Sequence, residues 1–261
     1  MTTLLTLERY LQLLWDEAES LARALQTEQF HAPVQACPGW SLADLGYHVG
    51  DVVRFWSWVV TTSAVTTDGE PEFARPADAE LADWIRNGVS ELVRDLTSAD
   101  PTAPAYSWTP QQDVAFVQRR VPHELSVHRW DAERAVQSHT GAQPRAIATD
   151  LATDGIAEFF LLASAFPVEQ PPRVDGVALI CTDSGAAWTS WLSGSAIQAL
   201  ERDDHVTVEG SGAPDAAASL SGTASDLVLT LWRRLPLGDG RVDVEGDHEL
   251  ARQFLSWANL E

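Results

Sequence analysis

Two residues in the middle of the chain carry metal-binding side chains at a spacing suited to one helix face. Glu124 and His128 lie four residues apart in the segment VPHELSVHRWDAE. On a helix, such residues project from the same face one turn apart, so both side chains can reach a common point. A carboxylate oxygen and an imidazole nitrogen are both ligands of divalent cations such as zinc. Because the same spacing also occurs in exposed pairs on ordinary helices, a third ligand is needed to predict a site.

A candidate for this third ligand is His48, which lies in the segment CPGWSLADLGYH, residues 37–48. Within this segment, Ser41 followed by Asp44 fits the S-x-x-D capping box that begins many helices. The pattern therefore predicts a helix from Ser41 to about Thr62, with His48 in its second turn.

Together, CPGWSLADLGYHV and HELSVHRWDAE resemble the two metal-binding segments of the mycothiol-dependent maleylpyruvate isomerase family, within the DinB-like helical-bundle superfamily. The resemblance covers nearly the whole chain and implies that His48, Glu124 and His128 bind the metal. It implies an α+β protein, in which an N-terminal DinB-like four-helix bundle holds the metal and a small sterol-carrier-like α+β domain follows. The family motif also carries an acid at Asp131, which would orient a metal-bound imidazole. The alternative for Asp131 is a salt bridge to a neighbouring arginine.

We expect the bundle domain to span residues 1–166 and the C-terminal domain to span residues 173–261, with a proline-rich linker between them. Hydrophobic spacing predicts four bundle helices and an extra helix that closes the first domain, at residues 6–26, 41–62, 78–96, 110–138 and 147–163. Pro122 is expected to kink or restart the fourth of these helices. In the second domain the pattern predicts strands at 174–182, 186–192, 205–210 and 241–245 and helices at 222–235 and 248–259.

The three candidate ligands define the chemistry. Two neutral imidazoles and one carboxylate leave a divalent ion with net positive charge, and an open coordination position would lower the pKa of a bound water or thiol. Zinc suits this set, although nickel, iron and manganese remain open. The family uses mycothiol as its thiol cosubstrate, so the resemblance implies that its thiolate adds to the double bond of maleylpyruvate and yields fumarylpyruvate. The same activation would serve thiol transfer to another small electrophile.

Two other functions remain open from the sequence. The bundle could bind metal and thiol as a stress-response or regulatory module without turnover, or it could activate water as a thiol-independent metal hydrolase. Thiol-dependent turnover separates the first interpretation from both alternatives.

Two neighbouring arginines in the C-terminal domain, Arg233 and Arg234, match the place where the family has an arginine facing the site. A guanidinium there would bind a carboxylate of the substrate or of the thiol cofactor through a bidentate pair, and we favour Arg234. The alternative is that both are solvated arginines at a helix C-terminus, where the helix dipole favours cations.

Bulk composition excludes several classes of partner. The net charge of -21 and the isoelectric point near 4.5 argue against binding to nucleic acid or to an anionic membrane surface. No apolar run has the length of a membrane span, and acidic residues occupy the N-terminal stretch where a secretory signal would be basic and apolar. We therefore expect a cytoplasmic protein, either a monomer or a homodimer, with no disulfide between Cys37 and Cys181. Cys37 is interpreted as a small buried residue rather than a nucleophile.

Overall fold

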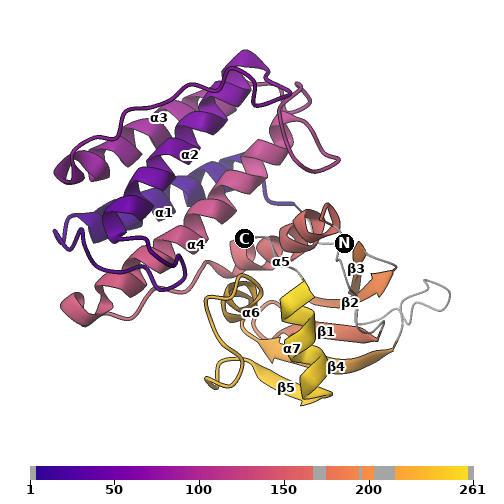
Figure 1. Ribbon diagram of the computed structural model, residues 1–261. Helices are drawn as coiled ribbons and strands as arrows, with labels where there is room; N and C mark the ends of the chain where they lie inside the picture. The colour runs from indigo at the N-terminus through magenta and orange to yellow at the C-terminus, as the bar shows by residue number, and fades with distance from the viewer. Residues whose placement is uncertain (1–3, 167–174, 194–195, 203–214, 258–261) are drawn as a thin grey trace. The chain divides into compact units, whose positions relative to one another are not determined.

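The computed structural model describes residues 4–166, 175–193, 196–202 and 215–257, which form two compact units (Figure 1). The first unit spans Leu5–Ile147 and the second begins at Ala148. Each unit has its own apolar core. The fold class is α+β, as the sequence predicts.

The first unit is a bundle of four long helices. They are α1 (Leu7–Leu25), α2 (Leu42–Thr62), α3 (Leu81–Ser98) and α4 (Val114–Thr140), and a short 3-10 turn (Asp78–Glu80) precedes α3. Helix α1 packs against α3 and α4, and α2 packs against the same two helices. Apolar residues that recur along α1 at helical spacing are fully buried, among them Leu14 and Leu21. This packing brings the middle of α2 next to the middle of α4.

Helices α2 and α3 pack closely because glycines line their contact. A Cβ atom on Gly50 of α2 would lie 2.0 Å from the indole ring of Trp84 on α3. Arg54 stacks over that same ring at 3.3 Å and donates a hydrogen bond to the Trp84 carbonyl. Since Gly50 follows His48 by only two residues, this contact fixes the part of α2 that carries His48.

Helix α4 begins later than the sequence pattern predicts. We expected a start near Pro110, but the helix begins at Val114, where the Asp113 side chain accepts a hydrogen bond from the backbone N–H of Phe116. An aspartate is among the strongest N-caps, and this cap determines the start. The helix is continuous through Pro122 and does not restart there. It ends at Thr140, and its C-cap is Gly141, whose φ is +71°.

The second unit combines three helices with a mixed sheet. Its elements are α5 (Thr149–Ser164), β1 (Gly176–Cys181), β2 (Ala187–Ser193), β3 (Ala196–Arg202), β4 (Ala216–Gly222), α6 (Ala224–Leu231), β5 (Asp243–Gly246) and α7 (His248–Trp257). The strand order is β3-β2-β1-β4-β5, with β1 and β4 parallel and the other pairs antiparallel. The predicted hairpin is present, since β1 and β2 pair around a turn in which Gly185 has a φ of +72°.

Helix α5 belongs to this second unit and not to the bundle, where we expected it. It packs against α6 and β3. The division therefore falls after Ile147, before the proline-rich segment that suggested a boundary near Phe166. Strands β3 and β4 were not predicted, and the strand expected at 205–210 lies outside the described residues. Among the helices that the structure describes, none has the length and apolar character needed to cross a membrane.

Candidate metal centre

The start of α2 positions His48. The Ser41 hydroxyl accepts a hydrogen bond from the Asp44 N–H, and the Asp44 carboxylate accepts one from the Ser41 N–H, so the predicted capping box is present. Arg75, in the loop after α2, forms an ion pair of 2.6 Å with the other carboxylate oxygen of Asp44. His48 lies in the second turn with its ring edge-on to Trp40, at 4.9 Å between centroids. The helix and the aromatic contact together restrict the imidazole to one region.

These contacts make the start of α2 sensitive to acid. Hydrogen bonds from Arg75 and Ser41 lower the pKa of Asp44 from about 3.8 to about 2. A carboxyl with a depressed pKa in the folded protein contributes stability above its unfolded pKa, and that contribution disappears as the pH falls through the folded value. We therefore expect Asp44→Asn to be destabilised at neutral pH, with a smaller difference from the parent at pH 2 than at pH 5. Urea denaturation across this range measures the effect, and Asp78→Asn, which removes the weaker 3.4 Å partner of Arg75, is the control.

Glu124 and His128 meet His48 across the α2–α4 contact. The Glu124 Oε1 atom lies 3.1 Å from His128 Nε2 and 3.6 Å from His48 Nε2. The rings of His48 and His128 have centroids 5.1 Å apart. All three ligand atoms lie within 4.8 Å of one another. The structure therefore brings together the three residues that the sequence singles out.

The donor set and its spacing fit a divalent cation. In a tetrahedral zinc site with bonds of about 2.0–2.1 Å, adjacent ligand atoms are about 3.3 Å apart. The distances of 3.1 and 3.6 Å from Glu124 Oε1 lie on either side of that value. His48 and Glu124 are half-buried and His128 is buried, so the group lies at the edge of the bundle core.

Arg120 contributes a contact that the sequence analysis did not predict. It lies one turn before Glu124 on α4, and its Nη2 donates to Glu124 Oε2, so that Oε1 faces the two imidazoles. Burial alone would raise the pKa of Glu124, but Arg120 and the two histidines hold it well below its usual range. The R-x-x-x-E spacing is the signal for this pair. Pro122 obscured it, because a proline between the two residues suggested a helix boundary.

Asp131 lies on the opposite side of the His128 ring. Its Oδ2 is 3.2 Å from His128 Nδ1, and its side chain is 0 % exposed. Burial disfavours a charged imidazole, but hydrogen bonds to Asp131 and Glu124 outweigh burial and raise the pKa of His128 to about 9. A carboxylate in this place fixes the ring orientation and the tautomer of a metal-binding histidine. The structure therefore places Asp131 against the His128 ring, and its role in orienting a metal-bound imidazole stays a prediction.

His123 and the two candidate arginines are each described by their own contacts. The ring of His123 is buried against Tyr10 of α1, at 6.4 Å between centroids. Arg233 and Arg234 follow α6 in the second unit. Arg233 has a φ of +59° and donates through Nη2 to the Leu255 carbonyl at 3.2 Å, and Arg234 donates through Nη1 to the Trp232 carbonyl at 2.8 Å.

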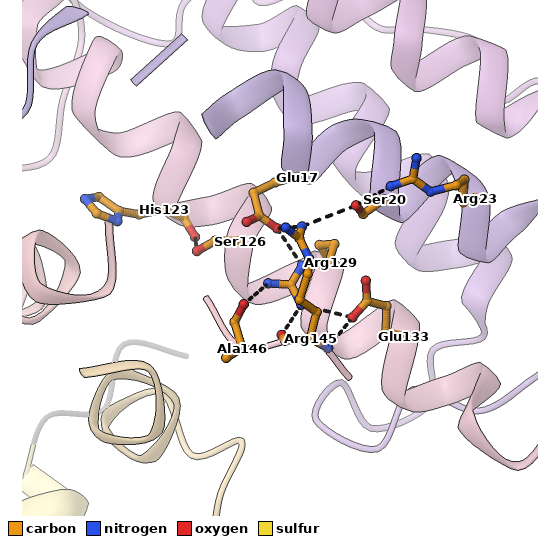
Figure 2. Close-up of polar contacts among 9 residues, drawn as sticks. All are labelled: Glu17, Ser20, Arg23, His123, Ser126, Arg129, Glu133, Arg145 and Ala146. Atoms are coloured by element: carbon orange, nitrogen blue, oxygen red, sulfur yellow. Dashed lines mark hydrogen bonds and ion pairs between the residues drawn. The ribbon is translucent and has the colours of Figure 1, made fainter. Parts of the chain in front are cut away.

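Behind the centre, α4 is tied to α1 by a buried charge network (Figure 2). Arg129, which directly follows His128, is 0 % exposed and donates to Glu17 on α1 and to Glu133 on α4. Its guanidinium also donates to the backbone carbonyls of Arg145 and Ala146, in the segment after α4. The residue after a candidate metal ligand therefore joins two helices and a loop.

Comparisons with known proteins identify similar sequences and folds. Residues 11–133 match the family model described as "Mycothiol maleylpyruvate isomerase N-terminal domain". A crystal structure of the mycothiol-dependent maleylpyruvate isomerase superposes with a TM-score of 0.61 at 15% identity, covering 93% of this chain and 95% of that one. A structure of a histidine-to-alanine mutant of the isomerase gives a TM-score of 0.57 at 13% identity, with coverage of 86% and 88%. At this identity the likeness shows the fold. A search of curated protein sequences gave no significant match.

Proposed function

Residues 11–133 belong to the mycothiol maleylpyruvate isomerase N-terminal domain family, and from this premise we propose that the protein is a metal-dependent enzyme that uses a low-molecular-weight thiol. The observation that carries the proposal is the convergence of His48, Glu124 and His128, whose ligand atoms lie within 4.8 Å of one another. We assign these residues to a divalent cation, with zinc favoured by two nitrogen donors and one oxygen donor. A cation held there would favour the thiolate form of a thiol at its open position.

The residues around the ligands would prepare them for this task. Asp131 would hold the proton on His128 Nδ1, which leaves the Nε2 lone pair directed toward Glu124 and His48. Arg120 would hold the second oxygen of Glu124, so that one oxygen remains for the cation. Both are positioning residues, since each acts through a ligand.

We propose mycothiol as the thiol and an activated double bond as its target. In a maleylpyruvate isomerase-like reaction, the thiolate adds to one alkene carbon, the resulting carbon–carbon single bond rotates, and the thiolate leaves, so that the cis isomer becomes trans with no net change in atoms. Thiol transfer to another electrophile would stop after the addition step. Such a substrate carries carboxylates, and we assign Arg234, with Arg233 beside it, to bind a carboxylate of the substrate or of the thiol.

The proposal places the enzyme in the cytoplasm, acting on small molecules as a monomer or homodimer. The net charge of -21 supports the assignment of small-molecule partners, because it disfavours binding to polyanions such as nucleic acid.

The test is turnover of maleylpyruvate by the purified zinc-loaded protein, with and without mycothiol. We expect conversion to fumarylpyruvate only when the thiol is present, and we expect Arg234→Met to raise KM more than it lowers kcat. Hydrolysis in thiol-free buffer would support a metal hydrolase instead. A protein that binds zinc and mycothiol but turns over neither this substrate nor a panel of other electrophiles would be a binding module, which would overturn the assignment as an enzyme.

A further inference from the structure

A second group of metal-binding side chains lies beside the candidate centre and shares His128 with it. The Cys37 Sγ atom, a ring nitrogen of His128 and a carboxylate oxygen of Asp131 all lie within 4.8 Å of one another. Cys37 is half-buried, and it comes from the turn before α2 rather than from α4. Two hydrogen bonds close this turn: Cys37 N–H donates to the Val34 carbonyl, and Trp40 N–H donates to the Cys37 carbonyl.

One member of each group, Glu124 and Asp131, faces a different nitrogen of the His128 imidazole. His128 Nε2 faces Glu124 Oε1 at 3.1 Å, whereas Nδ1 faces Asp131 Oδ2 at 3.2 Å. A neutral imidazole has one lone pair, because one nitrogen carries a proton and the other accepts. A cation on the Asp131 side therefore needs the tautomer in which Nδ1 has the lone pair and Nε2 carries the proton. In that tautomer Nε2 cannot bind a cation held by Glu124 and His48. The two groups are alternatives for the same ring.

The ligand types differ in a way that selects between cations. The group with Glu124 offers nitrogen and oxygen, whereas the group with Cys37 adds a sulfur. Soft thiolate ligands favour thiophilic metals, and a coordinating thiol gives up its proton when the metal binds. The carboxylate of Asp131, with no exposed surface, would offset the charge of the ion.

We propose that Cys37, His128 and Asp131 form a second cation site for thiophilic divalent metals such as cadmium, and that its occupation takes His128 away from the first site. The effect of this second site on activity rests on the proposed function, but the existence of the second site does not. A thiophilic ion in the second site disables the first site because the two sites share His128. The ion does not bind Glu124 or His48.

The test is a cadmium titration of the metal-free protein with both units present, monitored by thiolate-to-cadmium charge-transfer absorption. The chain has two cysteines, which provides a matched control: Cys181 is buried at the end of β1 in the other unit. We expect the parent and Cys181→Ser to develop the absorption up to one equivalent of cadmium. Cys37→Ser should lose it, with Cys37→Ala as a second variant should the serine side chain disturb the turn.

A Glu124→Gln variant separates this proposal from the assignment of the first site. The absorption should be at least as strong in Glu124→Gln as in the parent, because the competing group is weakened. Three results would each overturn the proposal: no absorption in the parent, absorption that persists in Cys37→Ser, or loss in Glu124→Gln. The last would mean that Cys37 only adds a ligand to the His48–Glu124–His128 group. Failure of zinc to bind the parent would contradict the first site alone and leave the cadmium result intact.

Discussion

Replacing Arg129 with methionine is expected to lower the free energy of unfolding by about 3–5 kcal/mol, because it removes the closest partner of the buried Glu17 carboxylate. Arg129 Nε lies 2.5 Å from Glu17, whose side chain is 1 % exposed, and its Nη1 lies 3.0 Å from Glu133 (Figure 2). Chemical denaturation at neutral pH measures the loss. Arg134→Met on the same helix is the control, and it should change stability by no more than about 0.5 kcal/mol, since Arg134 is exposed.

The pH dependence identifies Glu17 as the cause. Burial raises the pKa of Glu17 above its ordinary 4.5, against the opposing effect of Arg129 and Arg145. A carboxyl whose pKa is raised in the folded state makes the protein less stable as the pH rises above the pKa of that carboxyl in the unfolded chain. The penalty in Arg129→Met should therefore be largest at neutral pH and smaller near pH 4. Adding Glu17→Gln should recover part of the loss, and strictly additive effects of the two substitutions would contradict a direct pairing.

The cluster of His48, Glu124 and His128 was predictable because its sequence signals are local. Spacing of four residues places Glu124 and His128 on one face of any helix, and a capping box fixes the helix that carries His48. Arg129 was not predictable in the same way. Its partner Glu17 is far away in sequence, and only the packing of α1 on α4 brings the two together. A charged residue in a sequence is expected to be exposed unless a partner is known.

In the second unit, the sequence pattern did not predict every strand or the placement of every helix. Strand β4 has the sequence AAASLSG, which is poor in the β-branched and aromatic residues that favour strands. It forms because it pairs with β1 on one side and β5 on the other. Helix α5 was predicted with nearly correct bounds, but its periodicity does not say which core receives its apolar face. Tertiary pairing decides both cases, and a single sequence carries little information about it.

Removing one ligand is expected to abolish metal binding with little loss of fold. Purified parent protein should contain near one equivalent of zinc, and His48→Ala and Glu124→Ala should contain almost none. A catalytic site with three protein ligands retains only two after either change. Alanine favours the helical conformation and both residues are half-buried, so circular dichroism should show a folded bundle in both variants.

A graded series makes this prediction specific to the centre. Asp131→Asn removes a partner of a ligand rather than a ligand, so its zinc affinity should fall by about 10–100-fold and remain measurable. His139→Ala changes an exposed histidine in the last turn of the same helix, α4, and should retain the full zinc content. Full retention of zinc in both His48→Ala and Glu124→Ala would contradict the assignment. Equal losses in the Asp131 and Glu124 variants would instead point to Asp131 as a direct ligand, because an orienting residue affects the affinity only through His128.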